Sequence, residues 1–281
     1  MMTLLIARIT FREAFRRRLV LAVLILSAVF LGLYAFGFKI VHDDVVRFND
    51  ARQGRTLPYE VQASIMVLLG LYTVNFLAGI MTIFAAVGAI AREIEEGTLH
   101  AIIPKPLARW EIIAGKYLGF LAMIAAYITA MVTGVLLISI TVGAYTPPRI
   151  VEGMLLMILV SGILLSLTML GSTIFSTMAN GVVIFMLYGM AVTGGLVEQI
   201  GTALNNDTMV RIGIITSVLV PSDSIWKLAS YVVQPTLAVN LTGPNPFGTS
   251  TPPSDFAVRY AIVYCAVLVI TSMLVFRRRD I

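Results

Sequence analysis

The chain has 281 residues, of which 58% are hydrophobic and 12% charged, and its formal net charge is +5. Its mean hydropathy is +0.92. Because a soluble globular domain carries about 25% charged residues, this composition excludes an ordinary soluble domain and favours a protein embedded in a bilayer. The basic excess is typical of segments that flank membrane spans on the cytoplasmic side. Nucleic-acid binding is not indicated, since no basic stripe with interleaved aromatic residues occurs.

The N-terminal segment, residues 1–18, is predicted to form an amphipathic helix on the cytoplasmic membrane surface. Arg8 and Arg12 lie four residues apart on one helical face, whereas Leu4 and Phe11 lie on an apolar face. The alternative is that this segment is only the positively charged flank of the first span.

Long stretches without charged residues predict six membrane-spanning helices, since one crossing takes about 20 residues. The uncharged run from Gly153 to Val197 has 45 residues, which fits two crossings with a turn in the polar cluster near Ser176 and Asn180. The last span includes Arg259, whose side chain is expected to snorkel outward. The sequence therefore predicts one all-α polytopic membrane domain over residues 1–281. The predicted spans are about 19–38, 63–90, 117–142, 153–176, 181–199 and 256–276.

The basic residues predict that both termini are cytoplasmic, because Arg16–Arg18 and Arg277–Arg279 adjoin the first and last spans. Residues 91–116 are then a cytoplasmic loop, and residues 200–255 are an outer loop that ends in a Pro- and Gly-rich tail. Inside the outer loop, Ile212–Val220 is apolar but too short to cross. It is expected to form an interfacial or re-entrant helix that stops at the following proline.

The cytoplasmic loop has an unusual pattern, reading AREIEEGTLHAIIPKPLARWEIIAGKYLG over residues 91–119. Arg92–Glu96 is expected to continue the second span as a helix. Gly97 suits the break after that helix, and Thr98 is a suitable N-cap for a short helix over residues 99–103. The prolines that follow keep this helix short, and an amphipathic helix then resumes. The pattern predicts a short transverse helix on two stems, which suits the docking of a soluble partner.

This loop resembles the cytoplasmic signature of ABC-2 type transporter permeases, in E-x-E-E-G-T-L at 93–99 and P-L-A-R-W-E-I-I-x-G-K at 106–116. The basic T-F-R-E-A-F-R-R-R near the N-terminus and the final F-R-R-R-D-I extend the resemblance over the chain. The departure is Pro104-Lys105-Pro106, which places a proline ahead of the usual one. The resemblance implies that the loop carries a coupling helix seated on an ATPase subunit. The residues implied at that interface are Glu93, Glu95, Glu96, Gly97, Thr98, Leu99, His100, Pro104, Pro106, Arg109, Glu111 and Lys116.

The same resemblance implies the assembly. Two permease subunits, as a homodimer or with a similar chain, pair with two copies of an ABC ATPase in the inner (cytoplasmic) membrane. ATP and Mg are bound by the ATPase, so no cofactor is expected in this chain. The implied function is ATP-driven export of a substrate that the sequence does not identify. The alternative is a membrane anchor or mechanotransmission subunit that moves no substrate, which would favour a large folded outer domain.

Several sequence features argue against ATP hydrolysis, metalloprotease activity and ion-coupled transport by the chain itself. No G-x-x-x-x-G-K-[ST] motif occurs, because Tyr117 follows Gly115-Lys116 and Trp110 stands at the position of the first glycine. The two histidines are not in an H-E-x-x-H motif, so no metalloprotease site is expected. Charged residues are missing from the middle of the predicted spans, which disfavours an ion-coupled carrier. Glu198 is the nearest candidate and is expected at the membrane interface.

Overall fold

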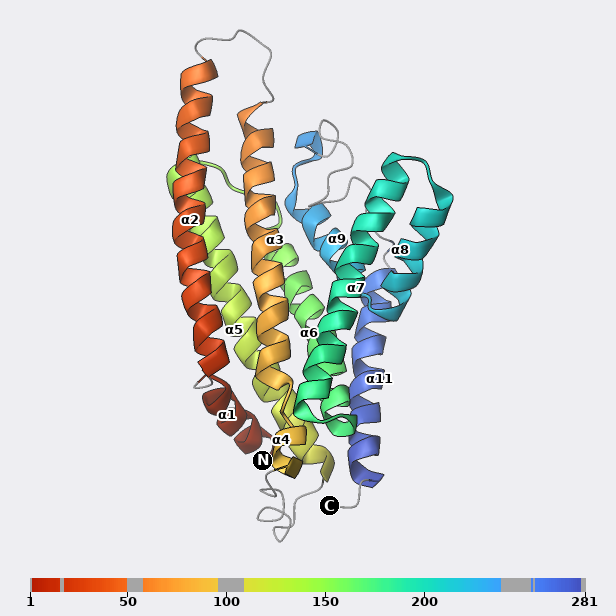
Figure 1. Ribbon diagram of the computed structural model, residues 1–281. Coiled ribbons are helices and arrows are strands. Elements are labelled where there is room, and N and C mark those ends of the chain that lie inside the picture. The colour runs from red at the N-terminus through yellow and green to blue at the C-terminus, as the bar shows by residue number, and fades with distance from the viewer. Residues whose placement is uncertain are drawn as a thin grey trace.

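The computed structural model describes residues 2–15, 18–49, 58–95, 109–238, 254 and 256–278, and these residues form helices joined by short turns, with no strand among them (Figure 1). Six helical segments are long and apolar enough to cross a membrane, which confirms the prediction of an all-α polytopic membrane protein. The helices are α1 (Met2–Phe15), α2 (Arg18–Asn49), α3 (Tyr59–Ala86), α4 (Ala91–Glu95), α5 (Arg109–Gly143), α6 (Ile150–Ile174), α7 (Thr177–Ala203), α8 (Asp207–Leu219), α9 (Ser222–Val233) and α11 (Phe256–Arg278).

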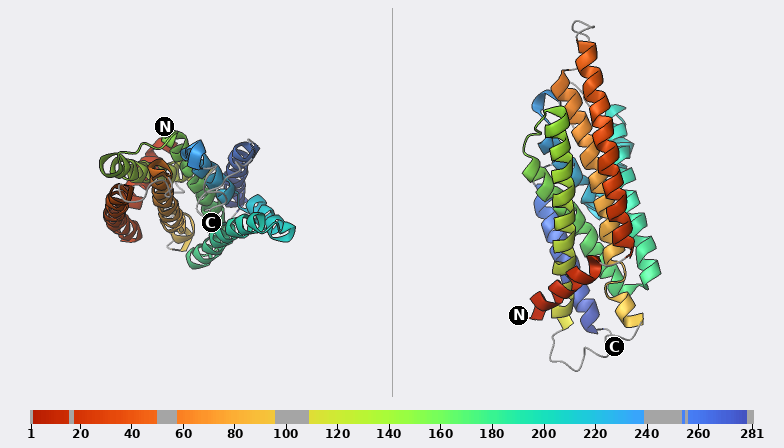
Figure 2. Two further views of the ribbon diagram at one scale, coloured as in Figure 1. Left: turned by 90° about the horizontal axis from the view of Figure 1, so that it is seen from above. Right: turned by 90° about the vertical axis from the view of Figure 1, so that its left-hand side faces the viewer.

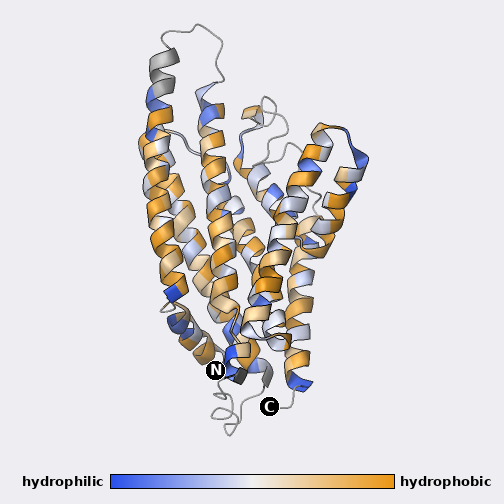
Figure 3. Cartoon of the chain, viewed as in Figure 1, coloured by the Kyte–Doolittle hydropathy of each residue, from blue (hydrophilic) through white to orange (hydrophobic). Residues whose placement is uncertain are grey.

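The long helices form one bundle with α3 and α6 in its interior and α2 and α11 on opposite sides (Figures 1 and 2). In the most apolar stretch of each helix, 78% of residues are buried in α3, against 17% in α2 and 11% in α11. Apolar residues cover the outward faces of the bundle, and hydrophilic residues gather toward its ends (Figure 3). Large apolar surfaces of this kind fit lipid hydrocarbon as their surroundings.

Both termini lie at one end of the bundle, here called the terminal end, together with α4 and the start of α5 (Figure 1). Helix α1 packs across this end against α5 (Figure 2). The two backbones approach closely at Gly119, where an added Cβ would lie 2.6 Å from the carbonyl oxygen of Ala7. Thr10 and Ala14 are buried, while Leu4 is 73% exposed. Helix α1 thus packs on the bundle and presents an apolar edge outward, and its place at a membrane surface stays a prediction.

Two helices differ in extent from the sequence expectation. Helix α2 continues to Asn49, well beyond the predicted span end at residue 38. The second span does not run unbroken into residues 92–96, because a turn over Val87–Ile90 separates α3 from α4.

The region predicted as an outer loop, residues 200–255, contains a helical hairpin that returns into the bundle. Helices α8 and α9 meet at a bend of 104°, and they pack against α7 and α6, respectively. Helix α8 begins at the N-cap Asn206, whose side chain accepts hydrogen bonds from the backbone of Thr208 and Met209, and it ends before Pro221. The predicted helix at Ile212–Val220 therefore belongs largely to α8, whereas α9 was not predicted.

We predict that Gly119→Ala lowers the stability of the protein, because the added methyl group meets the α1 backbone and helix packing tolerates such overfilling poorly. The expected cost is about 1–3 kcal/mol. The matched control is Gly32→Ala, since no atom lies within 4 Å of a Cβ at Gly32. Thermal unfolding in detergent should show a lower midpoint for Gly119→Ala alone, and equal midpoints for the two variants would contradict the close α1–α5 contact.

Candidate functional site

The break between α3 and α4, here called the elbow, spans Val87–Ile90 at the terminal end of the bundle. A break in a helix frees backbone carbonyl and amide groups from their usual partners. In an apolar environment each such group needs another hydrogen-bond partner, because no water is present to supply one. The elbow is therefore stable only if neighbouring side chains bind its backbone.

Three helices supply those side chains. Asn180 of α7 donates its amide to the carbonyl of Val87 at 2.8 Å, and the backbone N–H of Ile90 donates to the hydroxyl of Ser172 of α6 at 3.2 Å. The ammonium of Lys116 of α5 donates to the carbonyl of Ala89 at 2.5 Å. One side chain from each of α5, α6 and α7 thus binds the elbow.

Lys116 also joins the two stems of the predicted coupling loop. Its ammonium forms an ion pair with the carboxylate of Glu93 on α4, and the two side chains are 11% and 27% exposed. An ion pair this far removed from water is screened less than one on an open surface. The end of α4 and the start of α5, which flank residues 96–108 in the sequence, are therefore held together.

Asn180 reaches the elbow because α6 leaves space for it. A Cβ at Gly171 would lie 2.1 Å from Oδ1 of Asn180, so only glycine fits at that position of α6. The same amide also donates to the carbonyl of Thr168 at 3.1 Å, which ties α7 to α6. Asn180 is fully buried, and its two donated bonds fix its orientation.

The structure brings together two of the predicted coupling residues, Glu93 and Lys116. Glu111 is half-buried in the first turn of α5. Glu95 ends α4 and Arg109 begins α5, but the description does not extend to their side chains. The remaining predicted residues lie outside the described residues, as does the predicted transverse helix over 99–103. They are Glu96, Gly97, Thr98, Leu99, His100, Pro104 and Pro106.

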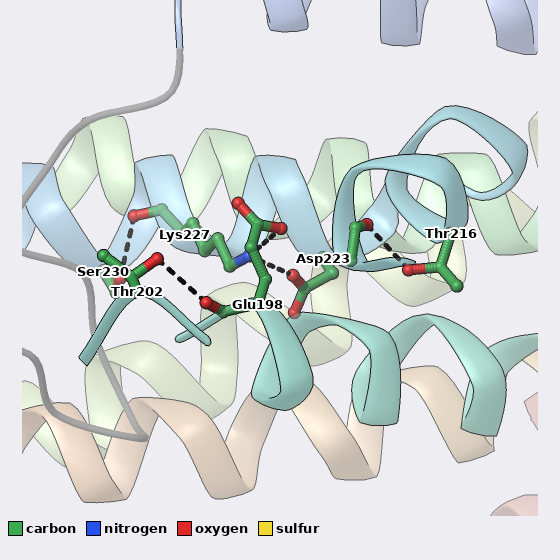
Figure 4. A network of polar contacts seen from close by, with 7 residues as sticks. Glu198, Thr202, Thr216, Asp223, Lys227 and Ser230 are labelled. Carbon is green, nitrogen blue, oxygen red and sulfur yellow. Dashed lines mark hydrogen bonds and ion pairs between the residues drawn. The ribbon is translucent and has the colours of Figure 1, made fainter. Parts of the chain in front are cut away.

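A second polar cluster, here called the ion network, joins α7 and α9 (Figure 4). The ammonium of Lys227 of α9 lies 2.8 Å from a carboxylate oxygen of Glu198 of α7 and 2.9 Å from one of Asp223 of α9. The side chains of Lys227 and Asp223 are only 7% and 10% exposed. A Cβ at Gly195 would lie 2.1 Å from Asp223, so a glycine again admits the polar group.

Sequence reasoning missed both clusters in part. Asn180 was assigned to a turn, and the contacts of Asn180 and Ser172 with the elbow were not foreseen. Glu198 was expected at the interface, and Asp223 and Lys227 were placed in an outer loop. The signal that was present is the i,i+4 spacing of Asp223 and Lys227, which puts opposite charges on one helical face. The ion network adds buried charge that the sequence did not indicate, although Asp223 and Lys227 lie outside the six predicted spans.

The family of the chain follows from its sequence as a whole. A family model described as "ABC-2 family transporter protein" matches residues 4–281. The chain belongs to the ABC-2 family of transporter proteins. No curated protein matches it. Members of this family are membrane transport components that are not themselves catalytic, and membership implies partnership with an ABC ATPase. This membership disfavours an ion-coupled carrier.

We predict that Asn180→Leu and Lys116→Met loosen the elbow of this ABC-2 permease. Each change leaves one elbow carbonyl without its side-chain donor, at an expected cost of about 1–3 kcal/mol. Hydrogen exchange measured by mass spectrometry should become faster over Val87–Glu95 in both variants. Thr193→Ala is the control, because the Thr193 hydroxyl bonds only to carbonyls of its own helix turn. Unchanged exchange over these amides would contradict the assigned role of the two side chains.

Proposed function

We propose that this chain is the permease subunit of an ABC exporter, driven through the elbow by ATP hydrolysis in a separate subunit. The observation that carries the proposal is the binding of the elbow by Lys116, Ser172 and Asn180. Because these residues belong to α5, α6 and α7, a displacement of α4 acts on three spans at once. Packed helices held by fixed hydrogen bonds shift as units and do not deform continuously.

The proposed mechanism begins at residues 96–108, which connect α4 to α5. Closure of two ATPase subunits moves this loop, and the Lys116–Glu93 ion pair makes both stems move together. The elbow then passes the displacement into the body of α3, which has the most buried apolar stretch of the six spans. Movement of α3 against its neighbours would open and close a path for the substrate across the membrane.

The orientation that we propose places the terminal end in the cytoplasm of the cell and the bundle in its inner membrane. The support is the arginine clusters at 16–18 and 277–279, which the positive-inside rule assigns to the cytoplasm. Both termini and α4 share that end of the bundle (Figure 1), so an ATPase docked there would meet the coupling loop. A second permease subunit, most simply another copy of this chain, completes the proposed assembly.

The alternative, a mechanotransmission subunit without a substrate, has less support. That function favours a folded domain beyond the outer membrane surface that receives the force. Of residues 200–255, the helices α8 and α9 instead pack back onto α7 and α6. The described part of this region therefore belongs to the bundle, which fits a transport role better.

We predict the topology from single-cysteine labelling in a Cys265→Ala background. Thr98→Cys should be protected from a membrane-impermeant thiol reagent in intact cells, because the coupling loop is cytoplasmic. Asn49→Cys and Thr249→Cys should react, because both positions lie in the proposed outer segments. Labelling of Thr98→Cys from outside would contradict the orientation, and its labelling in opened vesicles serves as the positive control.

We predict that the coupling loop is needed for ATPase partnership. Glu96→Arg and Gly97→Val should reduce the amount of ATPase that co-purifies and abolish transport, since charge reversal repels a basic partner surface and valine disfavours a left-handed helix end. The expected loss from the charge reversal is about 1–5 kcal/mol of binding free energy. The chain alone should hydrolyse no ATP, because it has no P-loop.

The control for these variants is Asn49→Ala, at the end of α2 far from the terminal end. Lys116→Met provides a sharper comparison, because it changes the elbow and leaves residues 96–108 intact. It should retain ATPase association but stimulate less ATP hydrolysis and transport. Full association and transport in Glu96→Arg and Gly97→Val would show that the loop is a plain connector.

A further inference from the structure

A cavity of about 420 Å³ lies between α7, α8, α9 and α11, next to the ion network. This volume falls in the range of about 300–1,000 Å³ that is typical of small-molecule sites. Its walls are mainly apolar and include Val218, Phe256 and Ala257, while its polar groups include Glu198 and Ser217. An apolar cavity with few polar groups is the usual form of a site for an amphipathic ligand.

The cavity walls are held in place by hydrogen bonds and close packing. The phenols of Tyr260 and Tyr264 on α11 donate to the carbonyls of Val218 and Leu219 at the end of α8, both at 2.7 Å. These bonds satisfy carbonyls that the end of α8 would otherwise leave free. On the other side, α8 lies so close to α7 that a Cβ at Gly213 would lie 2.3 Å from the Cβ of Glu198. The cavity is therefore a built feature of the fold and does not depend on one flexible side chain.

The charges of the ion network favour a positively charged ligand. Two carboxylates, Glu198 and Asp223, share one ammonium, that of Lys227, so the network has a formal charge of −1. One carboxylate oxygen of Glu198 contacts Lys227, and the other points away from it (Figure 4). Glu198 lines the cavity. A carboxylate in such surroundings binds a cation more strongly than it would in water.

We propose that this cavity binds an amphipathic amine, with its ammonium group on Glu198 and its apolar body against Val218, Phe256 and Ala257. The rings of Phe256 and Tyr260 stack with centroids 6.4 Å apart and form an aromatic wall of the same cavity. Aromatic faces attract organic cations, which adds to the preference for an ammonium group. A divalent metal ion is a poorer fit, because the described residues contain no group of three or more His, Cys, Asp or Glu side chains that could hold one.

The proposed site is tested by binding to the chain alone, so the result of that test does not depend on coupling to an ATPase. It would serve equally for a transported molecule or for a regulator, and the loop variants above leave it unchanged. A failure of the binding test therefore leaves the proposed transport function standing, and the reverse also holds.

The test uses three probes of nearly equal size, 4-phenylbutylamine, 4-phenylbutan-1-ol and 4-phenylbutanoate. Equilibrium dialysis against the purified chain in phosphatidylcholine nanodiscs, with empty nanodiscs subtracted, gives the affinity of each probe. The amine should bind at least about 10-fold more tightly than the alcohol, because a charge-assisted hydrogen bond replaces a neutral one. The butanoate should bind more weakly than the alcohol. Equal affinity of the amine and the alcohol would overturn the proposal and indicate an apolar groove that lipid fills.

Variants place the binding in the cavity. Glu198→Gln should remove the preference for the amine over the alcohol, whereas Glu152→Gln, an exposed carboxylate on α6, should preserve it. Because Glu198→Gln also changes the contact with Lys227, Ala257→Leu is the second variant, since it fills the cavity without touching the ion network. It should weaken both the amine and the alcohol by about 10-fold or more. Unchanged amine binding in Ala257→Leu, or a preference that persists in Glu198→Gln, would place the amine elsewhere and overturn the proposal.

Discussion

The structure depends on one constraint, which is that backbone polar groups freed by a helix break must find partners inside the protein. Hydrocarbon surroundings offer none, and each unpaired group costs several kcal/mol there. The bundle contains two such breaks, at the elbow between α3 and α4 and at the bend between α8 and α9. Lys116 and Asn180 bind the first, and the phenols of Tyr260 and Tyr264 bind the end of α8 at the second. Both breaks recruit side chains from distant parts of the chain, so each also fixes the packing of its neighbours.

Glycines make these contacts possible. Gly171 leaves space for the amide of Asn180, and Gly195 leaves space for the carboxylate of Asp223. In both places a polar side chain crosses to a neighbouring helix through a gap that any Cβ would close. Close approach of helices at small residues is the usual way in which membrane helices associate, since hydrophobic burial drives little packing between them in lipid. Here the same small residues also admit the groups that satisfy the helix breaks.

The sequence was sufficient for the six long apolar helices, because charge-free runs of about 20 residues match the thickness of the bilayer. It was not sufficient for the elbow, since Asn180 and Ser172 are common packing residues whose partners lie in another helix. It failed for Lys227 and Asp223, because charged residues in a short amphipathic segment normally indicate exposure to water. Lys227 is buried between two carboxylates, that of Asp223 one turn away and that of Glu198, which lies 29 residues from it along the chain. Pairings of this kind depend on tertiary structure and leave little trace in local periodicity.

Helix α7 takes part in both clusters, with Asn180 at the elbow and Glu198 in the ion network. The two residues are 18 positions apart, which corresponds to about 27 Å along an α-helix. The helix is continuous between them, so a displacement of one end is carried to the other without a hinge. If occupancy of the cavity shifts α7 and movement of the elbow shifts it too, the two events share one free energy of coupling. By linkage, a ligand that favours one position of α7 would then be bound more tightly whenever the elbow adopts the matching position. In that case α7 alone would couple the two events in both directions: movement of the elbow would change the affinity of the cavity for its ligand, and binding of the ligand would change the position of the elbow.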